Sequence, residues 1–155
     1  MPKDRTAGLK LFLARTVRMK LEGLYSPLGK MLTDLLGAHG VTESELSLTF
    51  VGRDRIRRLN QRYLGRDRVT DVLAFDLSDA KSTAGDRPLV GDIYVCVARA
   101  AGQAKEREMN LEEELFRLAA HGALHLLGYD HERPGQALRM TRLQEEAVKK
   151  YFPVP

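Results

Sequence analysis

The hydrophobic residues of the chain alternate with polar ones in some stretches and recur every three or four positions in others. Alternation is typical of strands with one buried face, whereas the longer period is typical of amphipathic helices. Residues 45–51 alternate cleanly and residues 9–13 partly, which predicts two strands. Two more apolar runs, 71–77 and 89–97, predict strands on either side of a polar loop at 78–88. These last two strands form either a long-looped hairpin or a crossover.

Helical periodicity predicts five helices, at residues 25–39, 52–68, 98–109, 110–128 and 136–151. The second helix has an apolar stripe of Ile56, Leu59 and Tyr63, so we expect these three side chains to be buried. His39 falls at the end of the first helix, where the helix dipole favours a cation. We therefore interpret His39 as a surface residue and not as a ligand.

Side-chain pairs are also expected on the last two helices. Asn110 and Glu113 have the spacing of a capping box, in which each side chain bonds the other's backbone N–H. Glu145 and Lys149 are four residues apart, the spacing of an ion pair on the exposed side of a helix. Glycine and three alanines at 119–123 are small, so we expect another element to pack closely beside this part of its helix.

Composition narrows the class of protein. At 155 residues, with 43% hydrophobic and 30% charged residues, the chain is expected to form a single domain over 1–155 with a loose tail at 1–8. No apolar run approaches the length of a membrane span, and no secretory signal is evident. Cys96 is the only cysteine, so it cannot form an internal disulfide, and we expect its side chain in the core. We expect the protein to be cytoplasmic and to have no membrane partner.

Positive charge is concentrated in one stretch. The net charge is +4, and seven arginines lie at 53, 55, 57, 58, 62, 66 and 68 with only Asp54 and Asp67 among them. Such a stretch is either a solvated helix face or a surface that contacts phosphates, for which the planar guanidinium is well suited. The residues alone leave both interpretations open.

Three of the four histidines lie within eleven residues, as His121, His125 and His131. His121 and His125 are one helical turn apart and share a face. Gly128 can take the left-handed conformation that ends a helix, which would let the chain turn back and bring His131 to the same point. Three imidazoles suit zinc and leave a fourth position open, as catalytic zinc sites do. An inert polar cluster, or a metal site without chemistry, is the alternative.

The spacing H-x3-H-x5-H also occurs in metzincin proteases, which place a glutamate directly after the first histidine as their general base. Here that position is Gly122, so a protease would lack its base. The same ligand set is compatible with phosphodiester cleavage, because zinc can polarise a phosphoryl oxygen. Asp130 is either a base or orienting group of such a site or, as we slightly prefer, a turn residue that caps the helix exit.

The histidine run, His-Gly-Ala-Leu-His-Leu-Leu-Gly-Tyr-Asp-His at 121–131, resembles the signature of the YbeY family of rRNA maturation factors, described as single-strand-specific endoribonucleases. Residues 59–67, 70–75 and 91–96 resemble further segments of that family, at similar spacing. The resemblance covers most of residues 45–135, and the glycine after the first histidine separates it from the proteases.

This resemblance implies an α+β fold in which a four-stranded mixed sheet packs with about five helices and the histidine helix is central. It implies one Zn²⁺, or another divalent metal, on His121, His125 and His131. It implies an enzyme that cleaves RNA in ribosomal RNA maturation, especially at the 3′ end of small-subunit RNA, and in ribosome quality control. The implied partners are ribosomal RNA, the ribosome or a small-subunit protein, and an assembly GTPase.

The chain departs from the family pattern at a position implicated in activity. The family usually has arginine directly after the tyrosine of its central segment, and this chain has Leu64. Smaller departures are Val69, Ala74 and Asp76. We expect Arg62 or Arg66 to reach the same phosphate. A ribosome-assembly factor that binds RNA without cleaving it, with a structural zinc, is the alternative function, and a metalloprotease is less favoured.

Overall fold

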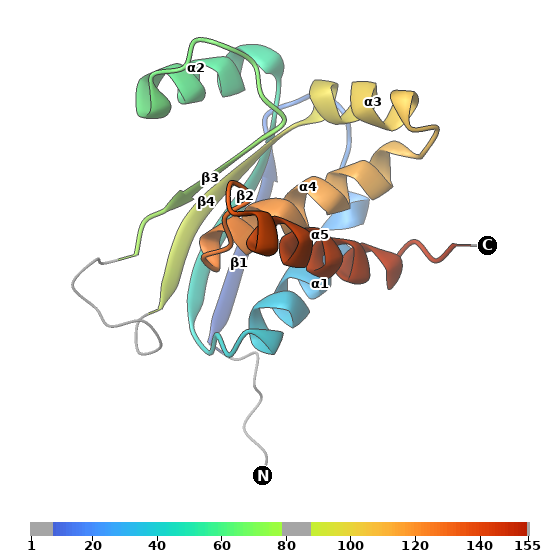
Figure 1. The fold of residues 1–155 in the computed structure, drawn as a ribbon. Coiled ribbons are helices and arrows are strands. Elements are labelled where there is room, and N and C mark those ends of the chain that lie inside the picture. Colours follow the sequence, from blue (N-terminus) through green and yellow to red (C-terminus); the bar gives the residue numbers. More distant parts are fainter. Residues whose placement is uncertain (1–7, 79–87, 155) are drawn as a thin grey trace.

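The computed structural model describes residues 8–78 and 88–154, which form a four-stranded sheet and five α-helices (Figure 1). The strands are β1 (Leu9–Arg15), β2 (Ser44–Val51), β3 (Val72–Asp76) and β4 (Leu89–Cys96). Their order is β1-β2-β4-β3, in which β1, β2 and β4 are parallel and β3 is antiparallel to β4. The mixed sheet is confirmed, and β3 and β4 are paired as a hairpin.

The helices are α1 (Tyr25–Ala38), α2 (Arg53–Leu64), α3 (Val97–Glu106), α4 (Leu111–Leu126) and α5 (Pro134–Lys149). A short 3-10 helix, η1 (Glu22–Leu24), precedes α1 and was not predicted. The second helix ends at Leu64 and not at 68, because Gly65 takes a left-handed conformation with φ of 68°. The last helix begins at Pro134 and not at 136, since proline fits the first helical turn.

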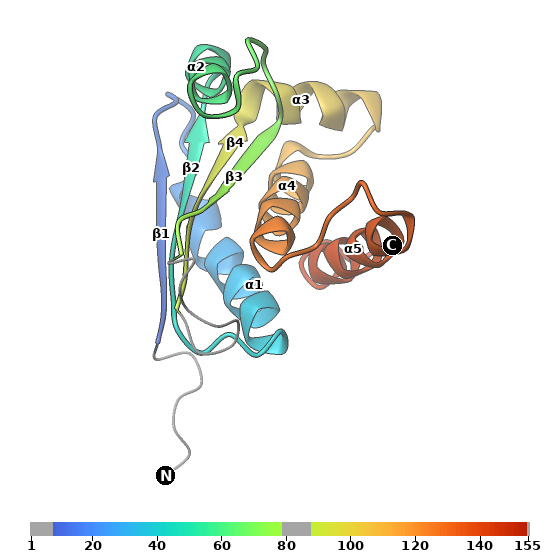
Figure 2. The same cartoon turned by 60° about the vertical axis from the view of Figure 1, so that its left-hand side comes forward.

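Two helices, α1 and α4, lie against one face of the sheet, and a third, α5, packs on their outer side (Figure 2). α4 lies against β3 and β4, α1 lies beside it toward β1, and α5 packs on α4. The core between these layers contains Leu48, Phe50, Ile93, Val95, Leu115, Phe116, Leu124 and Met140. α4 is therefore the central helix, as the family resemblance implied. The expected tail at 1–8 and loop at 78–88 fall, apart from their end residues Gly8, Ser78 and Pro88, outside the described residues.

The helix α2 packs instead on one end of the opposite sheet face. There Ile56 is fully buried with Val51, Leu73 and Cys96, so the expectation that Cys96 is a core residue is confirmed. The predicted burial of Tyr63 is wrong, because its side chain is 58% exposed. Asn60 occupies the buried face instead, and its Nδ2 donates a hydrogen bond to the Arg68 carbonyl at 3.0 Å.

Two predicted side-chain pairs are also wrong, for one reason. Asn110 does stand at the N-cap of α4, but its side chain makes no capping bond. Glu113 and Glu145 each bond Arg117, at 3.5 Å and 2.7 Å. A guanidinium with five donors competes for these carboxylates better than a backbone N–H or an exposed lysine does. Among the described residues no helix is both long and apolar enough to cross a membrane.

Candidate metal centre

The end of α4 brings the three predicted histidines together. His121 and His125 lie one turn apart on the helix. After Leu127, Gly128 has a φ of 100°, a backbone conformation that residues other than glycine rarely adopt. The Tyr129 N–H donates to the Leu124 carbonyl at 3.1 Å and the Gly128 N–H to that of His125 at 3.0 Å, which is the Schellman pattern. This turn reverses the chain, as predicted from Gly128.

The three imidazoles face one point. His121 Nε2 lies 3.1 Å from His125 Nε2, and His131 Nδ1 lies 3.2 Å from His125 Nε2. One nitrogen from each ring falls within a set whose members all lie within 4.8 Å of one another. Nitrogens bound to one tetrahedral zinc at about 2.0–2.1 Å are themselves about 3.3 Å apart. The donor set and its spacing therefore fit a zinc ion held by three protein ligands.

The electrostatics of the cluster favour an uncharged ring at His125. Burial first, and then the neighbouring His121 and His131, lower the pKa of His125 to about 4, although Asp130 opposes them. At neutral pH His125 is thus deprotonated, and its lone pair is available to a metal. The two histidines on α4, His121 and His125, are half-buried, whereas His131, in the turn after the helix, is exposed.

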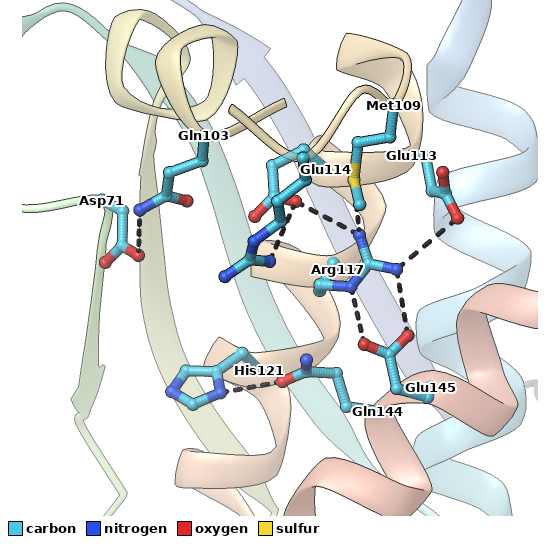
Figure 3. A network of polar contacts seen from close by, with 10 residues as sticks. Asp71, Gln103, Met109, Glu113, Glu114, Arg117, His121, Gln144 and Glu145 are labelled. Carbon is cyan, nitrogen blue, oxygen red and sulfur yellow. Dashed lines mark hydrogen bonds and ion pairs between the residues drawn. The ribbon is translucent and has the colours of Figure 1, made fainter. Parts of the chain in front are cut away.

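A glutamine of α5 orients the first histidine (Figure 3). The Nδ1–H of His121 donates to Gln144 Oε1 at 2.9 Å. An amide oxygen can only accept, so this bond places the proton on Nδ1 and leaves Nε2 free to bind a metal. The sequence analysis missed Gln144. No sequence motif links Gln144 to the histidines, because their contact depends on how α5 packs on α4.

A buried cluster next to Gln144 fixes that packing. Arg117 of α4 donates to both carboxylate oxygens of Glu145 on α5, at 2.7 and 3.0 Å, and to Glu114 at 3.2 Å (Figure 3). Glu114 is 1% exposed, so its charge depends on Arg117 and on Arg107, whose Nη1 lies 3.5 Å from the same carboxylate oxygen. Hydrogen bonds from Arg117 lower the pKa of Glu145, and those to Glu145 raise the pKa of Arg117. The cluster joins α5 to α4 one residue away from the glutamine that bonds His121.

The glycine after the first histidine has a packing role. A Cβ added to Gly122 would lie 2.8 Å from Ile93 Cγ2 and 3.4 Å from Val72 Cγ2. α4 therefore touches the sheet here at backbone distance, which confirms the prediction that small residues allow close packing beside the histidines. A glutamate at this position would displace Ile93, so this packing disfavours the general base of the metalloproteases.

The histidines line one wall of a cleft of about 530 Å³. The other walls come from β3 and from the segment that follows α2. Arg66 and Arg68 lie on the cleft, and so does Leu64, where the family has arginine. Arg62 is not among the lining residues, because its guanidinium lies over the Tyr63 ring at 5.4 Å from the centroid. Of the two predicted phosphate-binding arginines, the structure brings only Arg66 to the cleft.

Acidic groups at the cleft are held by their neighbours. Asp71, which lines the cleft, accepts from the Gln103 Nε2 at 3.1 Å and from the Val72 N–H at 2.8 Å. Asp130 accepts from the Glu132 N–H at 2.9 Å, as expected of a turn residue.

His39 lies apart from the histidine cluster and is half-buried, not at the surface as predicted. Its ring bonds the Leu35 carbonyl and the Tyr129 hydroxyl, both at 2.9 Å.

Comparison with known proteins agrees with this geometry. The sequence matches the profile of the family described as Endoribonuclease YbeY over residues 16–152. It is 45% identical over 114 residues to the Endoribonuclease YbeY of Anaeromyxobacter sp., which covers 74% of this chain and 58% of that protein. It is 50% identical over 105 residues to that of Myxococcus xanthus, which covers 67% of this chain and 35% of that protein. The chain thus matches under two thirds of the length of these two relatives.

A solved structure extends the likeness to the fold. The solution structure of the Thermotoga maritima protein TM1509 aligns with a TM-score of 0.63 and 29% sequence identity. The alignment covers 90% of this chain and 87% of that one. The likeness in fold therefore extends over most of the chain, and the family match at residues 16–152 includes the last helix, which the sequence motifs did not reach.

Proposed function

Because the chain belongs to the Endoribonuclease YbeY family, we propose that it is a zinc-dependent endoribonuclease specific for single-stranded RNA. Its proposed role is ribosomal RNA maturation at the 3′ end of small-subunit RNA, and ribosome quality control in the cytoplasm. The observation that carries this proposal is the cleft in which three converging imidazoles face Arg66 and Arg68. A cation site and phosphate-binding side chains that line the same cleft suit a phosphodiester.

The roles of the residues follow from their positions. His121, His125 and His131 would hold the zinc, and Gln144 would keep the His121 proton on Nδ1. Bound there, zinc supplies a Lewis acid for the scissile phosphate. Arg66 and Arg68 would bind the phosphates on either side and neutralise charge as the bond breaks. We assign no general base, and Asp130 remains a candidate whose carboxylate is engaged in its own turn.

The protease alternative finds no support. Position 122 is a glycine, and a Cβ there would lie 2.8 Å from Ile93 Cγ2, so the chain lacks the carboxylate that follows the first histidine of the proteases. Asp71 and Asp76 also line the cleft, but Arg66 and Arg68 bring to it two guanidinium groups, which bind phosphate better than they bind a neutral peptide bond.

A second candidate function is supported by one observation. Leu64 lies on the cleft wall where the family has arginine, so one phosphate-binding group is absent. This favours a ribosome-assembly factor that binds RNA and a small-subunit protein or assembly GTPase, with zinc holding the fold. Arg66 and Arg68 nevertheless supply two guanidinium groups to the same cleft, which is why we prefer the nuclease.

The test is cleavage of a labelled single-stranded RNA by the purified protein, the His121→Ala variant and a chelated sample. Circular dichroism checks the fold of each, and zinc is added back to the chelated sample. We expect cleavage only in the wild type and in the sample restored with zinc, with all folds intact. Equal cleavage in every sample would indicate a contaminating nuclease, and folded protein without cleavage would favour the assembly factor.

A further inference from the structure

The sheet face opposite α1, α4 and α5 carries three aromatic side chains in a row. The ring of Tyr63 on α2 lies 5.4 Å from that of Phe75 on β3, centroid to centroid. The Phe75 ring lies 6.1 Å from that of Tyr94 on β4. Phe75 and Tyr94 are half-buried, and Tyr63 is 58% exposed. Because strand side chains alternate, these rings point away from Ile93, which faces the α4 side.

Two arginines of α2 border this row. The guanidinium of Arg62 lies over the Tyr63 ring at 5.4 Å. Arg55, seven residues earlier on the same side of the helix, acts on the Tyr94 hydroxyl and lowers its pKa, against the larger upward effects of burial and Asp92. Among the described residues neither arginine forms an ion pair. By contrast, Arg57 on the other flank of α2 pairs with Asp67 at 2.7 Å.

We propose that this aromatic platform, consisting of Tyr63, Phe75 and Tyr94 with Arg55 and Arg62, binds single-stranded RNA outside the cleft by base stacking. The inference rests on the proposed function and specifies how the substrate is selected. One exposed ring and two half-buried rings, beside guanidinium groups that form no ion pair with the described residues, suit a chain that alternates flat bases with phosphates. A duplex hides its base faces, so the platform gives a physical reason for preferring single strands.

The platform is continuous with the cleft. Leu64 follows Tyr63 and lines the cleft, and Ala74 precedes Phe75 and lines it as well. β3 is the outermost strand of the sheet, so its two faces contribute to the two surfaces. A single strand whose phosphate lies between the histidines and Arg66 can therefore pass over the edge of β3 onto the rings.

Charge sets the far limit of the platform. Asp92 lies beside Phe75 in the strand register, and Glu45 lies one strand further on. Lys10 stands beside Glu45 in the register and offsets its charge, but the Asp92 carboxylate repels phosphates, so the RNA should not extend past Asp92 and Glu45 toward β1. Phe12 on β1 is 59% exposed, yet it lies beyond them and is a matched control for Tyr63.

The other role for these rings is to attach α2 to the sheet. That role is already filled by Ile56, which is fully buried, and by Leu59, which packs beside it. Tyr63 leaves more than half of its side chain in solvent, so its replacement removes little buried surface. Binding and stability can thus be separated at this residue.

The experiment measures fluorescence anisotropy of a 5′-labelled ten-nucleotide oligouridine with the full chain in chelator, which prevents cleavage. We expect Tyr63→Leu to weaken binding about tenfold, the usual scale for losing one stacked base. Tyr63→Phe, which keeps a ring, and Phe12→Leu should bind as the wild type does. Replacing Arg55 and Arg62 with alanine should reduce the dependence of log affinity on log salt by about 0.7 for each phosphate that the arginines no longer neutralise.

The outcomes separate this inference from the proposed function. Unchanged affinity in Tyr63→Leu, with wild-type cleavage still dependent on zinc, would overturn the platform alone. Equal weakening by Tyr63→Leu and Phe12→Leu would also overturn it, because the effect would not be local. Wild-type protein that neither binds nor cleaves the RNA would overturn both, and would favour a protein partner for this face.

Discussion

Gln144 and His121 are joined by a 2.9 Å hydrogen bond between α5 and α4, which fixes the proton of the imidazole on Nδ1. A histidine binds a metal more tightly when its other ring nitrogen is hydrogen-bonded, because that bond fixes the orientation of the ring and of the lone pair that binds the metal. The bond therefore makes the last helix part of the metal site, although no residue of α5 belongs to the histidine cluster.

Replacing Gln144 with leucine should weaken zinc binding about 10–100-fold, the usual effect of removing such a partner. The measurement is a competition titration against a chromogenic chelator. Gln144→Glu keeps an acceptor oxygen and should retain most of the affinity. Equal zinc affinity in Gln144→Leu and wild type would show that the glutamine does not orient His121.

Gly122→Ala should lower the free energy of unfolding by about 1–3 kcal/mol, because the added Cβ would lie 2.8 Å from Ile93 Cγ2. Urea unfolding followed by circular dichroism measures this change. Gly102→Ala is the matched control, since Gly102 lies within α3 and nothing lies within 4 Å of its added Cβ. That control should be neutral or stabilising by up to about 1 kcal/mol. Two equal decreases in stability would contradict the role given to Ile93.

Arg66→Ala and Arg68→Ala should each lower kcat/KM for RNA cleavage by about tenfold or more, because each removes a phosphate-binding group from the cleft. Leu64→Arg should raise kcat/KM, since it restores a guanidinium to the same wall. Arg53→Ala, at the start of α2 and outside the cleft-lining set, is the control. If Leu64→Arg left cleavage unchanged, the departure from the family pattern would have no catalytic consequence.

The ion pair between Arg117 and Glu145 predicts how stability depends on pH. Hydrogen bonds from Arg117 hold the pKa of Glu145 below its ordinary value of 4.5. Glu145 therefore contributes stability above pH 4.5 that is lost as the pH falls through its lowered pKa in the folded state. The Tm of Glu145→Gln should lie below that of wild type at neutral pH, and the difference should shrink on acidification. Glu146→Gln, which replaces an exposed carboxylate on the same helix, is the matched control.

The metal cluster could be predicted from the sequence because it is local. Two histidines share a helical turn, and a glycine at Gly128 permits the left-handed residue that returns the third. Only local rules of backbone geometry are needed to bring these side chains together. The same holds for the strand at 44–51, whose alternation directly reflects its buried and exposed faces.

What the sequence could not supply depends on packing between distant segments. Gln144 and Arg68 reach the site only after α5 docks on α4 and the segment after α2 folds over the cleft. Glu113 and Glu145 bond Arg117 and not Asn110 and Lys149, the partners that helical spacing predicted for them. Short-range pairing rules fail where a buried arginine offers a stronger partner.

The turn after α4 has a consequence for loading of the metal. Tyr129 is anchored to the Leu124 carbonyl and to the His39 ring, and the Asp130 N–H is held by Gln136. His131 comes next and is exposed, and among the described residues its ring hydrogen-bonds only His125. An arriving ion would thus meet two half-buried nitrogens on α4 and a third on the exposed side chain that follows the anchored turn. Movement of that one side chain would be enough to admit the ion, with no rearrangement of α4 or the sheet.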